Sequence, residues 1–222
     1  VKADRLVRNA KNLAFFRKSG RQGHARTIVE KLVSKGTTEI AMEYPVTTEI
    51  PTKDPRYKKI LSLFYQECTE KIKNLTEKGE DVCILCEGDP FFFGSFMHLY
   101  TRLKADHVVE VIPGITGMSG AWSATTEPIT WGDDVLTVLV GTLREEELTH
   151  HMSDTGALVV MKVGQNFEKI CLALKKTNLY HRAWLIEYAT MGKQKVAKLT
   201  NIKRKEVPYF SIIMVPGQGR RP

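Results

Sequence analysis

The sequence has no apolar run long enough to cross a membrane. Within its 222 residues, no stretch approaches the roughly 20 consecutive apolar residues that a membrane-spanning helix needs, and no segment resembles a cleavable signal peptide. We therefore expect a cytoplasmic protein with no membrane partner. Because 42% of the residues are hydrophobic, the chain can still bury a sizeable core, as one large or two modest domains.

Cysteine is scarce and is not arranged as a metal site. The four cysteines, Cys68, Cys83, Cys86 and Cys171, lie within apolar helix or strand patterns. Cys83 and Cys86 form a C-x-x-C pair, but this pair falls in a predicted strand and no second pair of ligands follows it. Buried, reduced thiols are therefore favoured over a zinc or redox site, and no metal is expected.

Acidic residues are fewer than basic ones, 25 against 33, which gives a formal net charge of +8. Such an excess can attract nucleic acid, an acidic membrane or an anionic small molecule, or it can serve solubility alone. Much of it lies in residues 193–205 (KQKVAKLTNIKRK), which we interpret as a solvent-exposed, charged connection. No aromatic residue interrupts this stretch and no known nucleic-acid motif is present, so we do not expect nucleic acid as a partner.

A second basic stretch covers residues 17–26 (RKSGRQGHAR) and follows a short apolar segment at residues 13–16. Its two glycines and its position predict a mobile cationic loop after a strand. Such a loop can bind carboxylates or phosphates. It can equally be a basic surface loop, and composition does not separate these two interpretations.

Strand-like and helix-like segments alternate along almost the whole chain. Helical stripes are expected at residues 28–33, ending at Gly36, and from Asp54-Pro55 to Gly79, where Asp54 is a good N-cap. Further helices are predicted up to Leu103 and over residues 167–174. Strands are predicted at residues 13–16, 82–86, 108–112, 135–140, 158–163, 183–188 and 209–215. This alternation is typical of an α/β fold.

The most informative feature is an apolar run, residues 82–86, that stops abruptly at Glu87-Gly88-Asp89-Pro90. Such a run suits a strand buried on both faces of a parallel sheet, so the turn would lie at the strand's carboxyl end, where open α/β sheets bind ligands. Gly88 allows backbone to approach a ligand closely, and Asp89 can accept hydrogen bonds. An ordinary strand-to-helix turn explains the same four residues, and the tetrapeptide alone favours it.

Three more turns follow strand ends, at residues 113–117 (PGITG), 140–143 (VGTL) and 163–166 (VGQN). In this order and at these separations the turns resemble those of the tetrapyrrole methylase family, the class III S-adenosylmethionine-dependent methyltransferases. The segments CEGDPFFFGSFMHLYTRL, VIPGITGMSGAWSA and PITWGDDVLTVLVGTL are similar to the branch that methylates C-20 of precorrin-2, giving precorrin-3A in cobalamin biosynthesis. FFRKSGRQGHAR, YPVTTE, VVMKVGQN and PYFSIIMVPG fit the same branch, so the resemblance covers essentially the whole chain.

The resemblance implies two α/β domains with a cofactor cleft between them, in a homodimer. Residues 1–114 are expected to form an amino-terminal α/β domain with a parallel sheet, and residues 115–222 a carboxy-terminal α/β domain with a mixed sheet. Family members begin with a short strand and a glycine-proline-rich loop before their first helix. This sequence is expected to start inside that helix, at residues 1–6, with the amino-terminal strand and loop missing.

The resemblance further implies S-adenosyl-L-methionine as methyl donor, no required metal and an anionic tetrapyrrole as substrate. The residues expected to bind the cofactor are Glu87, Gly88, Asp89, Phe92, Thr116, Gly117, Val163 and Ala189. For Val163 and Ala189, ordinary core packing is the alternative. The basic residues expected to bind the substrate's acetate and propionate groups are Arg17, Lys18, Arg21, His24 and Arg26. Glu87, Asp89 and His98 are candidates for a general base, and none of them is assigned.

Two other functions compete with methylation of precorrin-2. One keeps the family and changes the substrate to cobalt-factor II, the metal-containing counterpart in the anaerobic pathway. The phrase TWGDDVLTVLVGTL favours the metal-free substrate. The other is a basic binding module without catalysis, which predicts salt-dependent binding to RNA and no affinity for S-adenosylmethionine.

Overall fold

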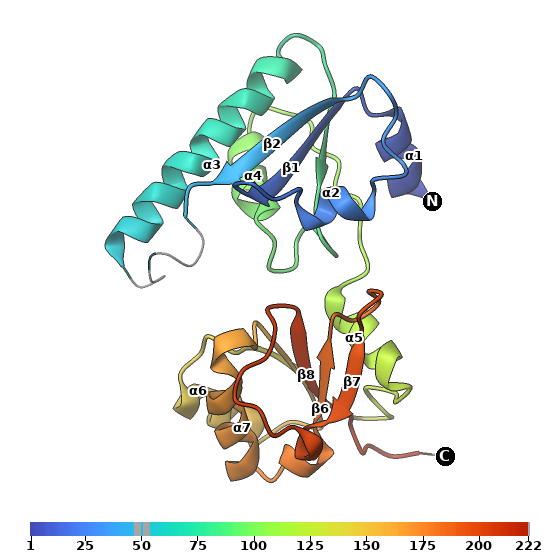
Figure 1. Cartoon of the computed structure of the whole chain (residues 1–222), viewed down its shortest axis with the longest axis vertical. Helices are drawn as coiled ribbons and strands as arrows, with labels where there is room; N and C mark the ends of the chain where they lie inside the picture. The colour runs from blue at the N-terminus through green and yellow to red at the C-terminus, as the bar shows by residue number, and fades with distance from the viewer. Residues whose placement is uncertain (47–49, 51–53, 222) are drawn as a thin grey trace. The chain divides into compact units, whose positions relative to one another are not determined.

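The structure is a computed structural model that describes residues 1–46, 50 and 54–221. The chain forms two compact units, Val1–Thr116 and Gly117–Pro222, and each has its own sheet (Figure 1). The boundary expected from the sequence, between residues 114 and 115, lies two residues before the one observed. Residues 47–49 of the YPVTTE segment lie outside the described residues.

The sheet of the first unit is parallel throughout. It consists of β1 (Asn12–Lys18), β2 (Thr38–Tyr44) and β3 (Val82–Leu85), in the order β2-β1-β3. The central strand carries the most apolar run, since Leu13, Ala14 and Phe15 are all buried. The three strands end at one edge of the sheet, which we call the carboxyl edge of the first unit.

Helices cover both faces of this sheet (Figure 1). On one face, α1 (Lys2–Asn9) and α2 (His24–Ile28) contribute Val7 and Ala25 to a buried cluster. On the other face, α3 (Pro55–Thr76) and α4 (Phe96–Leu103) pack against Ala14 and Met42. The predicted start of α3 is confirmed, because the Asp54 carboxylate accepts a hydrogen bond of 2.8 Å from the Arg56 backbone N–H.

The sheet of the second unit is mixed and has the strand order β4-β5-β8-β6-β7. Its strands are β4 (Leu136–Val140), β5 (Ala157–Met161), β6 (Trp184–Glu187), β7 (Lys195–Lys198) and β8 (Ser211–Val215). β4 and β5 are parallel, and β8 is antiparallel to both β5 and β6. β4, β5 and β6 therefore run in one direction and end at one edge, the carboxyl edge of the second unit, where β8 begins.

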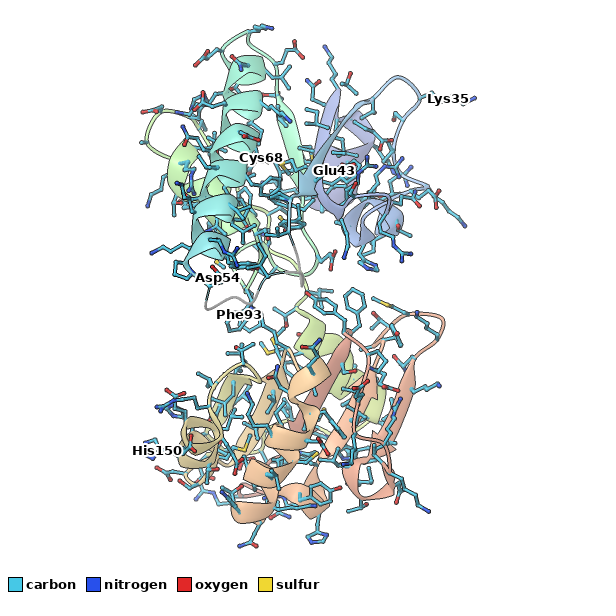
Figure 2. The ribbon with its side chains drawn as sticks, turned by 60° about the vertical axis from the view of Figure 1, so that its left-hand side comes forward. Lys35, Glu43, Asp54, Cys68, Phe93 and His150 are labelled. Atoms are coloured by element: carbon cyan, nitrogen blue, oxygen red, sulfur yellow. The ribbon has the colours of Figure 1, made fainter. Side chains whose placement is uncertain are left out.

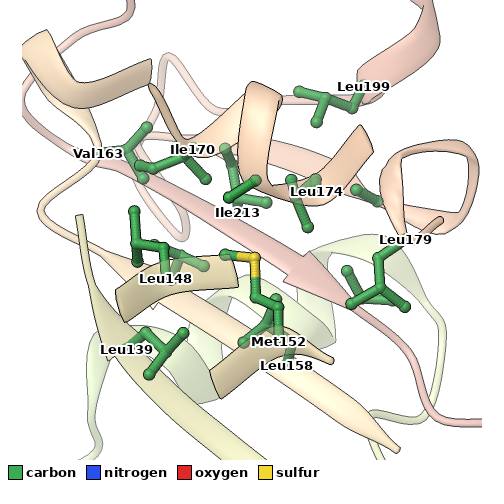
Figure 3. Close-up of a cluster of buried hydrophobic side chains, with 14 of the residues drawn as sticks. Leu139, Leu148, Met152, Leu158, Val163, Ile170, Leu174, Leu179, Leu199 and Ile213 are labelled. Carbon is green, nitrogen blue, oxygen red and sulfur yellow. The ribbon is translucent and has the colours of Figure 1, made fainter. Parts of the chain in front are cut away.

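The main core of the second unit lies beneath α6 (Glu145–Met152) and α7 (Phe167–Lys176). Three 3₁₀ turns complete this face: η1 (Gly164–Asn166), η2 (Tyr180–Arg182) and η3 (Leu199–Asn201). Leu148, Ile170, Leu174 and Ile213 are among its fully buried side chains (Figure 3). On the opposite face, α5 (Gly117–Thr125) packs against β6 and β8.

Three sequence-based expectations about elements are wrong. Residues 108–112 form no strand, although Val109 and Val111 pack into the core while Val108 is exposed. Residues 193–205 are not simply a charged connection, because they contain the edge strand β7 and η3. The helix expected over residues 28–33 instead starts at His24 and ends at Ile28, and turns follow it.

The turn at residues 131–134 (WGDD) holds the carboxy-terminal end of the described chain. The Asp134 carboxylate accepts a hydrogen bond of 2.8 Å from the Trp131 N–H, and the backbone N–H groups of Gly219 and Gln218 help to keep its pKa low. Gly217 leaves no room for a side chain, because a Cβ there would lie 1.9 Å from Asp134 Oδ2. This turn precedes β4, so it lies at the edge opposite the carboxyl ends of β4, β5 and β6.

We expect Gly217→Ala to lower the free energy of unfolding by about 1–3 kcal/mol, the usual cost of overpacking a buried position. The reason is that Asp134 is fixed by its hydrogen bonds and cannot yield to the new methyl group. Urea denaturation measures the change. Gly192→Ala is the matched control, because nothing lies within 4 Å of a Cβ at Gly192. Equal stabilities of the two variants would contradict the idea that Asp134 needs the space beside Gly217.

Candidate active site

Two of the predicted turns meet at the carboxyl edge of the first unit. Glu87, Gly88 and Asp89 follow β3, and Phe92 lies three residues further on. A Cβ on Gly114 would lie only 2.0 Å from the Gly88 carbonyl oxygen, so the two backbones touch. The Asp89 carboxylate accepts hydrogen bonds from the N–H groups of Gly114 (3.0 Å) and Phe91 (2.9 Å). These bonds lower the pKa of Asp89, so this side chain fixes the loop as a stable anion.

Glu87 lies in a different electrostatic environment. Its side chain reaches the surface, yet surrounding protein desolvates the carboxyl group and raises its pKa. Charge attraction from His24 and a hydrogen bond from the Ala25 N–H oppose this shift without cancelling it. The structure thus brings Glu87 next to the start of α2, inside the predicted basic stretch. Of the two acids in the loop, Glu87 is the better proton acceptor, since a carboxylate with a raised pKa is the stronger base.

His98, the third base candidate, lies on α4 with its ring stacked on Tyr65, at a centroid distance of 4.4 Å. Desolvation and the nearby Arg102 lower the pKa of His98, which favours the neutral imidazole.

The same region holds a hydroxyl cluster that the sequence did not reveal. Tyr44, the last residue of β2, is 2.5 Å from Ser95 Oγ, and the Tyr65 hydroxyl donates to that oxygen at 3.3 Å. Its members come from separate elements, so no local pattern could have identified the cluster.

The predicted basic loop is shorter than expected. Arg17 and Lys18 belong to β1 and His24–Arg26 to α2, which leaves residues 19–23 as the connection. Arg26 is only 12% exposed and forms a two-pronged ion pair with Glu39, at 2.8 and 2.7 Å. This pair lowers the pKa of Glu39 and raises that of Arg26. Glu39 lies on the edge strand β2, which the sequence pattern did not predict, so this ion pair was not expected.

Arg17 is likewise paired, since its Nε and Nη2 donate to Glu43 Oε1 at 2.9 and 2.5 Å. Glu43 lies near the end of β2 (Figure 2). Arg21 is exposed within the connection between β1 and α2. The five predicted basic residues therefore lie in one region, but two of their arginines already hold carboxylates of the protein.

At the carboxyl edge of the second unit, α5 packs through two of its glycines, Gly117 against Ile212 and Gly120 against Ala189. A Cβ on Gly117 would lie 3.7 Å from Ile212 on β8, and one on Gly120 would lie 3.8 Å from the Ala189 Cβ. Thr116 directly precedes this helix. Val163 follows β5 at the same edge, but its side chain is fully buried in the core (Figure 3). Because the whole residue is 0% exposed, its backbone is covered as well, and a contact between Val163 and a ligand would require a local movement that uncovers it.

Strained backbone marks this second edge. Lys162, Tyr188 and Thr190 have φ angles of 54°, 51° and 64°, a region that side chains other than glycine rarely adopt. These residues directly flank Val163 and Ala189. Such strain costs of the order of 1–3 kcal/mol at each residue and is concentrated at functional sites. The sequence gives no warning of it, because lysine, tyrosine and threonine carry no turn signal.

The described part of the chain holds no group of three or more His, Cys, Asp or Glu side chains that could bind a metal ion. Burial raises the pKa of Cys83, and raises that of Cys86 to about 12, so the C-x-x-C thiols stay protonated at neutral pH. Within the same described residues, none of the helices is long and apolar enough to cross a membrane.

The chain is similar over most or all of its length to known methyltransferases. A precorrin-2 C(20)-methyltransferase of Sinorhizobium sp is 44% identical over 222 residues, which is 100% of this chain and 91% of that protein. A cobalt-precorrin-2 C(20)-methyltransferase of Salmonella typhimurium is 24% identical over 205 residues, 90% of this chain and 83% of that one.

Solved structures share the fold at low sequence identity. A cobalt precorrin-4 methyltransferase has a TM-score of 0.71 at 15% identity, with 97% of this chain and 87% of that chain covered. A uroporphyrin-III C-methyl transferase from Thermus thermophilus, complexed with S-adenyl homocysteine, has a TM-score of 0.65 at 18% identity and covers 97% of this chain and 89% of its own. The family model for tetrapyrrole (corrin/porphyrin) methylases matches residues 1–203. The resemblance seen in the turns is therefore confirmed, and the chain belongs to the tetrapyrrole methylase family.

Proposed function

We propose that the protein transfers a methyl group from S-adenosyl-L-methionine to the C-20 meso carbon of precorrin-2, giving precorrin-3A in cobalamin biosynthesis. The observation that carries the proposal is the 44% identity over the full chain with a precorrin-2 C(20)-methyltransferase. The relative that acts on cobalt-precorrin-2 is only 24% identical, which favours the metal-free substrate. As the family resemblance implies, we also propose a cytoplasmic homodimer that needs no metal.

Each carboxyl edge, taken by itself, has features that suit a nucleoside cofactor. Ala189 is small and half-buried, and a residue with strained backbone lies on either side of it. Gly88 and Gly117 add no side chain bulk where backbone must approach a ligand. A fold neighbour complexed with S-adenyl homocysteine supports the same cofactor class. We propose Glu87, Asp89, Phe92, Thr116 and Val163 as further cofactor contacts.

The cofactor, when bound, supplies an electrophilic methyl group on a positively charged sulfur. The chain then has to hold C-20 of the substrate in line with that methyl group and to accept the proton that C-20 loses. Glu87 is the residue we propose for the second task, since desolvation raises its pKa while hydrogen bonds lower that of Asp89. Asp89 would instead keep the loop in place.

Incubation with precorrin-2 and S-adenosylmethionine carrying a labelled methyl group tests the reaction directly. Under anaerobic conditions we expect a product with one added methyl, which carbon NMR places at C-20. Parallel reactions with cobalt-factor II should be markedly slower. Preferential turnover of the cobalt complex would reassign the substrate. Binding of RNA without binding of S-adenosylmethionine would favour the non-catalytic module instead.

Glu87→Gln should lower kcat by about 10²–10⁴-fold, the usual contribution of a general base. The wild-type rate should fall on acidification through the pKa of Glu87, which lies above that of an ordinary glutamate because of desolvation. Below that pKa the carboxyl group is protonated and cannot accept the proton from C-20. Single-turnover rates measured against pH test both points, and Asp89→Asn serves as a comparison. A variant whose rate and pH profile match the wild type would remove Glu87 from the role.

Arg21 and Arg26 should respond differently to substitution by alanine. Arg21→Ala should raise the KM for precorrin-2 about 3- to 10-fold, as expected for loss of a partly exposed contact to a substrate carboxylate of about 1 kcal/mol. It should leave both cofactor affinity and Tm unchanged. Arg26→Ala should lower Tm, because Glu39 then loses its two-pronged partner. Steady-state kinetics and thermal melts on both variants separate these roles, and an unchanged KM for Arg21→Ala would count against the predicted substrate loop.

A further inference from the structure

A buried acid stands directly beneath the strained turn at the carboxyl edge of the second unit. Glu187 is the last residue of β6 and only 2% exposed, and the turn Tyr188–Thr190 follows it at once. One of its carboxylate oxygens, Oε2, lies 2.7 Å from Arg204 Nη2, and the Arg204 side chain is 45% exposed. A charge that is this deeply buried is expensive unless it is paired.

The pair is incompletely satisfied in the described part of the chain. Glu187 Oε1 has no hydrogen-bond partner there, and neither has the hydroxyl of Ser211, a residue that is 3% exposed. Ser211 is opposite Glu187 in the register of β6 and β8, so both side chains point to the same face of the sheet. A well-packed apolar pair at this place would often be as stable or more stable. Stability alone therefore does not explain why an acid is found here.

The position of the acid suggests what it does. Arg204 belongs to the segment between η3 and β8, whose Ile202 and Val207 pack on the core next to α7. The ion pair ties this segment to the end of β6, one residue before the strained turn begins. The turn itself is held by hydrogen bonds from the Tyr188 N–H to the Phe210 carbonyl (2.8 Å) and from the Thr190 N–H to Gln194 Oε1 (2.6 Å). The backbone before, within and after the turn is thus held by three contacts: the ion pair with Arg204, the Phe210 carbonyl and the Gln194 side chain.

We propose that Glu187, held by Arg204, is a positioning residue that keeps the Tyr188–Thr190 turn in its strained, cofactor-binding conformation. The inference rests on the proposed function, because it takes Ala189 as a cofactor contact. Glu187 acts through the backbone of the turn and does not itself touch the cofactor. Removal of the pair should let the turn relax toward ordinary backbone angles, so that the backbone at Ala189 moves out of place.

The matched control is the neighbouring residue. Lys205 also pairs with a glutamate, Glu168 on α7, at 3.3 Å, but both partners are exposed, at 81% and 61%. The two variants Arg204→Ala and Lys205→Ala therefore remove adjacent cations from the same segment. Only the first of them leaves a buried carboxylate without its partner.

Binding of S-adenosylhomocysteine, measured by calorimetry, tests the proposal. We expect Arg204→Ala to raise the Kd at least tenfold and to raise the KM for S-adenosylmethionine, with the KM for precorrin-2 unchanged. Lys205→Ala should behave like the wild type. Equal dissociation constants for the two variants would overturn the proposal. If the wild type itself bound no S-adenosylhomocysteine, the proposed function would fail first and the positioning role with it.

A second variant separates positioning from general stability. Glu187→Leu combined with Arg204→Met replaces the ion pair by apolar side chains and should restore the Tm that Arg204→Ala loses. If the pair positions the turn, affinity for S-adenosylhomocysteine stays weak in this stable double variant. Recovery of both Tm and affinity would show that the pair only fills space, and the proposal would be wrong.

Discussion

The backbone contact between Gly88 and Gly114 is the constraint on which the first unit's edge depends. A side chain at Gly114 would place its Cβ 2.0 Å from the Gly88 carbonyl oxygen, so only glycine permits the approach. Asp89 then bonds the Gly114 N–H and fixes the loop that carries Glu87. The second unit uses the same device, because a Cβ at Gly141 would lie 2.8 Å from the Lys162 carbonyl oxygen. In both units, glycine lets neighbouring segments pack backbone against backbone where parallel strands end.

The parts of the fold that the sequence predicts are those whose signal is local. The buried runs that became β1, β3, β5 and β8 are apolar because helices or neighbouring strands cover them, and the predictions placed them within about two residues. The missed strands, β2 and β7, are both edge strands. Their exposed sides carry glutamate or lysine, which weakens the apolar pattern and protects a free edge from association. Residues 108–112 show the opposite error, since Val109 and Val111 are packed with period two but pair with no strand.

The same division applies to the candidate site. The turns at the strand ends could be predicted from their glycines, because glycine is the residue that allows close approach of backbone segments. These glycines are Gly88, Gly114, Gly117 and Gly141. The strained residues Lys162, Tyr188 and Thr190 carry no such signal, since the surrounding structure imposes their backbone angles. The acids that pair with Arg17, Arg26 and Arg204 come from other elements of the chain. Pairing of this kind is a property of the fold, and a linear reading of charge cannot detect it.

These pairs change what the net charge of +8 means. An arginine that holds a carboxylate of its own protein offers a substrate carboxylate little, because the newcomer must first displace the resident partner. Arg26 is held at two points and is mostly buried, so displacement there would also expose Glu39 without its cation. Arg17 is more accessible but has the same obstacle in Glu43. If the proposed anionic substrate binds here, the field of the whole basic stretch would attract it, and direct contact would fall to exposed residues such as Arg21 in the connection between β1 and α2. Counting basic residues overstates the binding surface, and the acids opposite them determine which part of it a ligand can use.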